Sequence, residues 1–168
     1  MRFLVDSPLG GLAKWLRFSG FDTELRPLAR IPPGDLPPPS PGLYLLTRQK
    51  SLAKLQRHDI LVLTAAEPEA QLKEVFQRLK ISRRDLDPLS RCVRCNVPLQ
   101  PVAREAVAGR VPEHVFHTHE EFYECPACHR LYWPGSHIRG ISRKLAQALK
   151  RPGKGISSKT ITRTRSIA

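Results

Sequence analysis

The sequence lacks several features that would each define a class of protein. It has no apolar run of the roughly 20 residues that a transmembrane helix needs. The first residues, M-R-F-L-V-D, lack the long apolar core of a secretory signal peptide. Acidic residues are missing from the last part of the chain, since none follows Glu124. We therefore expect a soluble, cytoplasmic protein without a membrane partner, whose C-terminal part carries charge of one sign.

Cysteine is also scarce, and all of it falls into two Cys-x-x-C pairs. The first pair is Cys92 and Cys95, and the second is Cys125 and Cys128. Each pair places two thiolates on one tight turn, so two such turns facing each other can complete the tetrahedral coordination of Zn²⁺. The alternatives are two disulfides or four unrelated buried thiols, but disulfides are typical of secreted chains. The spacing predicts a structural zinc site in a ribbon over 90–140.

Positive charge, in contrast, is abundant. The chain has 28 Lys and Arg residues against 15 Asp and Glu, which gives a net charge of +13 over 168 residues. Such an excess points to a polyanionic partner, either nucleic acid or an anionic membrane surface. Ten of the basic residues follow Cys125, so the contact should centre there. Residues 141–168 are predicted to form a basic helix and a flexible tail of the kind that becomes ordered on RNA.

The N-terminal half alternates strand-like and helix-like segments. Strands are predicted at 2–5, 21–25, 43–47 and 60–64, with helices after Ser7 and from Pro68 onwards. The proline-rich segment 26–42 should be an extended surface loop with at most one helical turn. This order predicts a small parallel α/β sheet with flanking helices over 1–85. Asp6 would end the first strand, where open α/β sheets bind their ligands.

Several stretches resemble the PIN-like ribonuclease family known from the C-terminal RNase domain of Mut-seven. They include F-L-V-D-S-P-L-G-G-L-A-K-W-L-R-F-S-G-F-D-T near the N-terminus, L-L-T-R after it, and R-C-V-R-C-N and H-E-E-F-Y-E-C-P-A-C-H-R-L-Y-W around the cysteines. The stretches follow one another in the family's order over roughly 1–140. The resemblance implies a PIN-type α/β domain followed directly by a zinc ribbon, and it implies chemistry on RNA.

The resemblance also implies a set of carboxylates that binds Mg²⁺ or Mn²⁺ at the carboxyl ends of the strands. Such an ion activates a water molecule and offsets the charge that develops on the attacked phosphate. Asp6 matches the family's first acid, although an Asp at this place can also cap a helix. Where the family has T-R-D after a strand, this chain has Gln49, a neutral amide that is a poor ligand for a hard cation. The catalytic candidates that remain are Asp6, Asp22 and Glu67.

Basic side chains near the same strand ends predict contacts with RNA. The candidates on one segment beside the expected cleft are Arg48, Lys50, Lys54 and Arg57. The ribbon and the helix after it add Arg94, Arg130, Arg139, Arg143 and Lys144. A run of charges can also be an ordinary solvated helix face. Aromatic residues of the ribbon can stack unpaired bases or form the ribbon's small core, and they are Phe122, Tyr123, Tyr132 and Trp133.

Three functions are consistent with these features. The first is an active ribonuclease that uses Asp6, Asp22 and Glu67 with Mg²⁺ or Mn²⁺. The second is an RNA-binding protein on the same scaffold, with catalysis weakened or lost at Gln49 and with structured RNA, including ribosomal RNA, as its partner. The third is a protein-interaction module whose charge serves solubility. Because the loss of carboxylates removes repulsion against phosphate, Gln49 favours the RNA-binding hypothesis.

Overall fold

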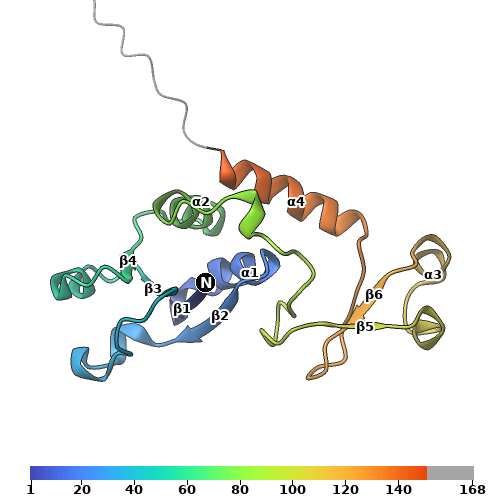
Figure 1. The fold of residues 1–168 in the computed structure, drawn as a ribbon, viewed down its shortest axis with the longest axis horizontal. Helices are drawn as coiled ribbons and strands as arrows, with labels where there is room; N and C mark the ends of the chain where they lie inside the picture. The colour runs from blue at the N-terminus through green and yellow to red at the C-terminus, as the bar shows by residue number, and fades with distance from the viewer. Residues whose placement is uncertain (151–168) are drawn as a thin grey trace, which may run out of the picture.

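The molecule consists of a parallel sheet with helices, a small ribbon, and a C-terminal helix that returns from the ribbon to the sheet (Figure 1). The computed structural model describes residues 1–150, except for the side chains of His137 and Arg139. The predicted tail after residue 150 lies outside the described residues. Within 1–150, no helix combines the length and the apolar character that crossing a membrane requires.

Four parallel strands form the main sheet, as the sequence predicted. Their order in the sheet is β2-β1-β3-β4, and their bounds are β1 (Arg2–Asp6), β2 (Asp22–Arg26), β3 (Leu43–Thr47) and β4 (Ile60–Val62). Because all four strands run in the same direction, their carboxyl ends meet at one edge, which we call the carboxyl edge. Asp6 and Thr47 end neighbouring strands at the carboxyl edge, whereas Asp22 begins its strand at the opposite edge.

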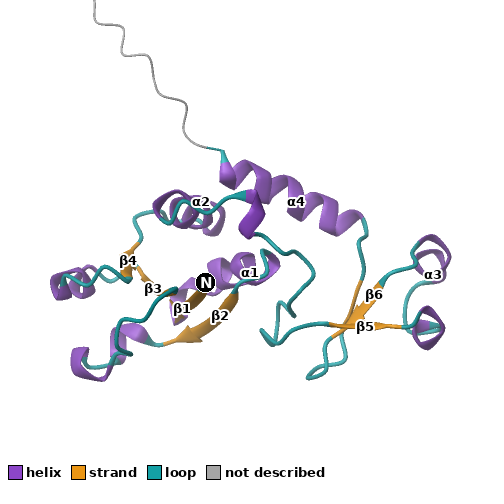
Figure 2. Cartoon of the chain, viewed as in Figure 1, coloured by secondary structure: helices purple, strands orange, loops and turns teal. Residues whose placement is uncertain are grey.

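Three helices cover one face of the sheet (Figure 2). They are α1 (Gly10–Phe18), α2 (Pro68–Arg78) and α4 (Ser136–Leu149). Phe3 and Val5 alternate along β1, point to this face and are fully buried among leucines of α1 and α2. Leu145 and Ala148 of α4 belong to the same apolar cluster. The helix that follows the ribbon is therefore part of the sheet's core, and the predicted division into 1–85, 90–140 and 141–168 stays a prediction.

Short 3-10 turns cover the opposite face of the sheet. This face is formed by Leu4, Leu45 and Ile60, which are the alternate residues of their strands. Turns at Leu28–Arg30, Pro33–Asp35 and Lys50–Leu55 place further leucines against it. Two of these turns lie in the proline-rich segment, because proline fixes φ and removes the donors that a longer helix needs.

The ribbon, residues 90–135, is built on a three-stranded antiparallel sheet. Its strands are β5 (Gln100–Val102), β6 (Phe122–Glu124) and β7 (Leu131–Tyr132), and the short helix α3 (Glu113–Thr118) lies between β5 and β6. Its apolar cluster is small and contains Val107, Val111, Val115 and Phe122. A segment of this size cannot fold by burying so few side chains, so the ribbon needs another source of stability.

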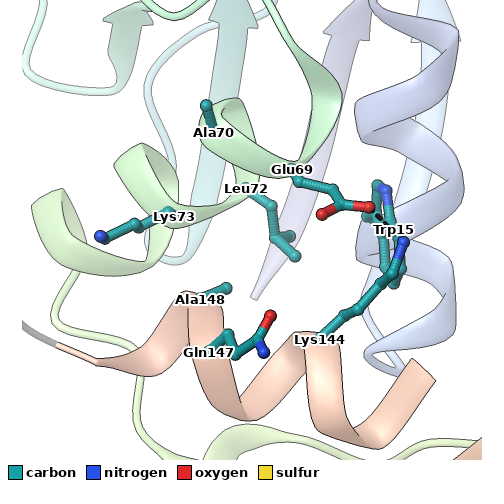
Figure 3. Close-up of a pocket in the computed structure, with 8 residues that line it drawn as sticks. All are labelled: Trp15, Glu69, Ala70, Leu72, Lys73, Lys144, Gln147 and Ala148. Atoms are coloured by element: carbon teal, nitrogen blue, oxygen red, sulfur yellow. Dashed lines mark hydrogen bonds and ion pairs between the residues drawn. The ribbon is translucent and has the colours of Figure 1, made fainter. Parts of the chain in front are cut away.

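Polar contacts fix α4 on the other two helices (Figure 3). The Lys144 ammonium pairs with a Glu69 carboxylate oxygen at 2.5 Å and lies 5.5 Å from the centre of the Trp15 ring. Figure 3 shows these side chains around a hollow of about 250 Å³, with Leu72 and Ala148 also lining it. Lys144, a predicted RNA contact, therefore has two partners within the protein.

A buried ion pair fixes the loop that precedes β4. The Asp59 side chain is only 2% exposed and accepts hydrogen bonds from Arg57 Nε at 3.0 Å and Nη2 at 2.6 Å. Arg57 Nη2 also donates to the Pro37 carbonyl oxygen at 2.6 Å. The hydrogen bonds from Arg57 lower the pKa of Asp59 below its ordinary value. Arg57, predicted to contact RNA, is thus engaged in holding the fold.

We predict that Arg57→Met lowers the free energy of unfolding by about 3 kcal/mol at pH 7, because it leaves the Asp59 carboxylate buried without its partner. Since the pKa of folded Asp59 is lowered, the contribution of the pair is complete above the unfolded pKa of about 4, and it is lost as the pH falls through the folded value. Urea unfolding at pH 7 measures the change. Arg48→Met, at an exposed position, should change stability by less than about 0.5 kcal/mol. An equal effect of both substitutions would contradict the role of the pair.

Candidate functional site

Four cysteine sulfurs converge where the two Cys-x-x-C turns face each other. The sulfurs of Cys92, Cys95, Cys125 and Cys128 all lie within 4.8 Å of one another. The sulfurs of Cys92 and Cys128 are 3.7 Å apart, and a tetrahedron with Zn–S bonds of about 2.3 Å has edges of about 3.8 Å. All four cysteines are free rather than paired in disulfides. The predicted ligands are brought together and could hold a metal ion such as zinc.

The two cysteine turns share one backbone geometry. In the first turn, the Asn96 N–H donates to the Cys92 carbonyl oxygen at 2.8 Å, and in the second, the His129 N–H donates to that of Cys125 at 2.9 Å. Asn96 and His129 each follow the second cysteine of their pair, and both have left-handed backbone conformations, with φ of 64° and 56°. This conformation reverses the chain directly after the cysteine, so that both thiols of a pair face the same point.

Hydrogen bonds favour a thiolate at Cys92. Burial raises the pKa of this thiol, but hydrogen bonds from the Tyr132 hydroxyl at 3.2 Å and the Cys95 N–H at 3.3 Å outweigh burial, and the pKa falls to about 6. The pKa of Cys95 is raised to about 12, chiefly by its hydrogen bond with Cys128. One negative charge therefore forms readily, whereas a bound cation is needed for all four thiols to ionise together.

The first cysteine turn is fastened to β2, the edge strand of the parallel sheet. Asn96 Oδ1 accepts a hydrogen bond from the Thr23 N–H at 2.9 Å, and Asn96 Nδ2 donates to Asp22 Oδ1 at 2.7 Å. Arg17 Nη1 donates to two carbonyl oxygens of the same turn, at 3.0 and 3.1 Å. These contacts bond the edge strand β2 to the first cysteine turn and set the position of the cysteine cluster relative to the sheet.

The three acidic candidates do not gather at one point. Asp6 ends β1, but Asp22 pairs in register with Arg2 at the other end of that strand, and four residues of strand span about 13 Å. Glu67 is exposed and precedes α2 as its N-cap residue. Among the described residues, the cysteines form the one group of three or more metal-binding side chains close enough to share an ion. The structure therefore does not assemble Asp6, Asp22 and Glu67 into one set.

Asp6 links the ends of β1 and β3 at the carboxyl edge. Its side chain is buried, with Oδ2 accepting from the Thr47 hydroxyl at 2.8 Å and Oδ1 accepting from the Ser7 N–H at 3.1 Å. The second of these bonds is the helix-capping role that the sequence left open. The Thr47 hydroxyl oxygen in turn accepts from the Gln49 N–H at 3.0 Å. Gln49 itself is exposed next to this network, so a neutral side chain stands where the resemblance implies the third acid of the set.

Exposed cations lie at the carboxyl edge and on the turn that follows it. Arg26 ends β2 in register with Asp6, Arg48 directly follows β3, and Lys50 and Lys54 lie in the 3-10 turn Lys50–Leu55, all of them exposed. Arg26 also forms an exposed ion pair with Glu24 at 2.6 Å. We call Arg48, Lys50 and Lys54 the basic turn.

The other predicted RNA contacts lie on the ribbon and on α4. Arg94 is exposed between the first two cysteines, and Arg130 is exposed after the second cysteine turn. Arg143 and Lys144 are exposed on α4, whereas the side chain of Arg139 lies outside the described residues. The predicted RNA contacts thus fall into two groups, one in the segment after β3 and one on the ribbon and α4.

Sequence reasoning missed three residues that position the site: Arg17, Thr47 and Asn96. A signal for Asn96 exists, because it holds the same place after its cysteine pair as His129 does. A signal for Thr47 also exists, because it ends the predicted strand 43–47 and therefore lies at the carboxyl edge, where a metal site was expected. Arg17 carries no signal of its own, because its partners on the cysteine turn lie more than 70 residues away in the chain.

A known protein family matches almost all of the residues that the structure describes. The family model described as the Mut7-C RNAse domain matches residues 1–145. The chain belongs to the Mut7-C RNase domain family. The match spans the parallel sheet, the ribbon and most of α4, and an RNase family implies RNA as the substrate or partner. No curated protein and no solved structure matches the chain.

Removing the Tyr132 hydroxyl should weaken metal binding without abolishing it. Tyr132→Phe keeps the ring but loses the hydrogen bond to Cys92, and the loss of such a supporting contact typically lowers metal affinity about 10- to 100-fold. Competition with a chromophoric chelator at fixed pH measures the affinity for Zn²⁺. Tyr123, directly opposite Tyr132 on β6, supplies the control, because Tyr123→Phe should bind Zn²⁺ like the unmodified chain. The same affinity in all three proteins would exclude the role given to Tyr132.

Proposed function

We propose that this member of the Mut7-C family is an RNA-binding protein in which ribonuclease activity is weakened or lost. The observation that carries the proposal is the composition of the carboxyl edge. Asp6 lies there with the neutral Gln49 beside it, and Asp22 lies at the other end of the sheet. A single carboxylate holds Mg²⁺ poorly, because such sites usually need a second acid in addition to the substrate phosphate.

The charge at the same edge supports the binding of phosphate. The Asp6 carboxylate is buried and hydrogen-bonded, whereas the basic turn is exposed to solvent. A phosphate that approaches this edge therefore meets cations before it meets the carboxylate, and the attraction is of the salt-sensitive kind that dominates binding to nucleic acids. Arg94 and Arg130 add exposed positive charge on the ribbon. We propose structured RNA, including ribosomal RNA, as the partner.

We propose zinc as the metal of the cysteine cluster, in a structural role. Four thiolates at tetrahedral spacing match the preference of Zn²⁺, and a site closed by four protein ligands leaves no position for a reacting water. The apolar cluster of the ribbon is too small to stabilise its fold alone, so metal binding would supply much of the free energy of folding. Free thiols at this site suit a reducing compartment, so a cytoplasmic location is part of the proposal.

The alternative is an active metal-dependent ribonuclease. The position of Asp6 at the carboxyl edge and the membership of the Mut7-C family favour it. In this case Asp6 would hold Mg²⁺ or Mn²⁺ together with Glu67 and the phosphates of the RNA. Asp22 would not take part, since it accepts a hydrogen bond from Asn96 at the far end of the sheet.

Neutralising the basic turn should weaken RNA binding and flatten its dependence on salt. The triple variant Arg48→Gln, Lys50→Gln, Lys54→Gln removes up to three phosphate contacts, each of which contributes about one unit to the slope of log affinity against log salt. Fluorescence anisotropy with a labelled RNA hairpin over a salt series, in EDTA-free buffer with the zinc-loaded protein, measures both quantities.

The matched control changes the same number of charges elsewhere on the surface. Lys80, Arg83 and Arg84 are all exposed between α2 and the ribbon, so their replacement by Gln should alter the slope much less. If the two triple variants lose affinity equally, only the overall charge matters, and the carboxyl edge is not the binding surface.

A further inference from the structure

An apolar hollow lies where α1, the ribbon and α4 meet. Its volume is about 310 Å³, and three aromatic rings line it, those of Phe18, Tyr132 and Trp133. Ile138 and Ile141 of α4 complete its wall. The three rings are all half-buried, so each presents part of its surface to the solvent. Among the side chains that the structure describes, which exclude those of His137 and Arg139, no carboxylate and no basic group lines the hollow. Its size lies at the lower end of the range for ligand pockets, about 300–1,000 Å³.

The rings of the hollow are held in place by the metal centre and the backbone. The Tyr132 hydroxyl is bonded to Cys92 at 3.2 Å, so this ring is fixed to a ligand of the metal cluster. The Trp133 indole lies against Gly135, where an added Cβ would come within 2.7 Å of the indole nitrogen. Phe18 packs on Trp15, with ring centres 5.9 Å apart. Each of the three rings that line the hollow is therefore held by a contact within the protein.

We propose that this hollow binds one unpaired nucleobase of the bound RNA, stacked on the aromatic rings. This proposal rests on the proposed RNA binding. Aromatic side chains bind bases of unpaired RNA by stacking, and every base offers a face for it. Because the Tyr132 hydroxyl is already engaged, the hollow offers few groups that could read the edge of the base. The site therefore accepts bases with little sequence preference.

The surroundings of the hollow fit an RNA strand better than an apolar partner. Arg130 directly precedes the strand that lines it, and Lys14 lies one turn before Phe18 on α1. Both cations are exposed, so phosphates of a bound strand would find positive charge near the hollow. The apolar surface also stops at the hollow. Among the described residues, the large apolar side chains classed as exposed are only Met1 and Leu25, and a stable contact between two copies needs a much broader surface, about 1,000 Å² or more.

The test compares normal RNA with RNA that keeps its phosphates but has no bases. Anisotropy is measured on the zinc-loaded full chain with a labelled single-stranded RNA and with an abasic oligomer of the same length. We expect the abasic oligomer to bind about tenfold more weakly. Phe18→Leu, which keeps an apolar side chain but removes the ring, should lower the affinity for normal RNA severalfold and leave that for the abasic oligomer unchanged. Phe116→Leu, a half-buried ring on α3 outside the hollow, should change neither.

A spectroscopic readout places the base at the hollow. The chain has two tryptophans, so Trp15→Phe leaves Trp133 as the single reporter. Normal RNA should quench its fluorescence, and the abasic oligomer should not.

The nucleobase site would be wrong if the unmodified chain bound both oligomers with equal affinity, or if Phe18→Leu lowered the affinity for both oligomers equally. In either case the proposed RNA binding would still stand. Failure of both oligomers to bind would instead remove the proposed function on which the site rests. If Trp133 became shielded only as the protein concentration rises, with sedimentation showing a dimer, the hollow would be a contact between copies and the proposal would be wrong.

Discussion

The convergence of four cysteine sulfurs is the constraint on which the rest of the molecule depends. It fixes the first cysteine turn, and through Asn96 that turn is bonded to the edge strand of the sheet. It also fixes Tyr132, whose ring lines the hollow beside α4. After the ribbon, the chain returns as α4 and completes the core above the sheet. Removal of the proposed zinc should therefore loosen β2 and the aromatic hollow as well as the ribbon, because these parts are joined by direct contacts.

The carboxyl edge of the sheet combines one buried carboxylate with exposed positive charge, which supports the proposal that ribonuclease activity is weakened or lost. Asp6 is held by the Thr47 hydroxyl in a buried network. Two residues after Thr47 stands the neutral Gln49, with the exposed Arg48 and Lys50 on either side of it in the chain. Divalent ions need concentrated negative charge, whereas phosphates need the opposite. A neutral side chain in place of an acid would weaken a metal site and favour a phosphate, which supports the proposal that this scaffold of an RNase family serves as a binding surface.

Local patterns in the sequence were sufficient for the elements and for the metal ligands, but not for contacts between distant segments. Short apolar runs between helix-like segments predicted the strands of the parallel sheet, and the repeated Cys-x-x-C spacing predicted the cluster. Asp22 shows where such reasoning stops. It lies in a stretch that matches the family, yet strand direction places it at the far end of the sheet, bonded to Asn96. Arg57 is a second example, because the sequence suggested an exposed RNA contact, whereas the structure pairs it with the buried Asp59. Whether side chains two residues apart form an ion pair depends on the backbone conformation between them, which the sequence pattern does not give.

The most direct test of the central claim is a cleavage assay on the zinc-loaded chain with end-labelled single-stranded and structured RNA. Each RNA is incubated with Mg²⁺, with Mn²⁺ and without a divalent ion, and Asp6→Asn is run in parallel. The account predicts salt-sensitive binding of the RNA with no metal-dependent cleavage, and the same binding by Asp6→Asn. Cleavage that requires both the divalent ion and Asp6 would contradict it and would show that this carboxyl edge still forms a working nuclease.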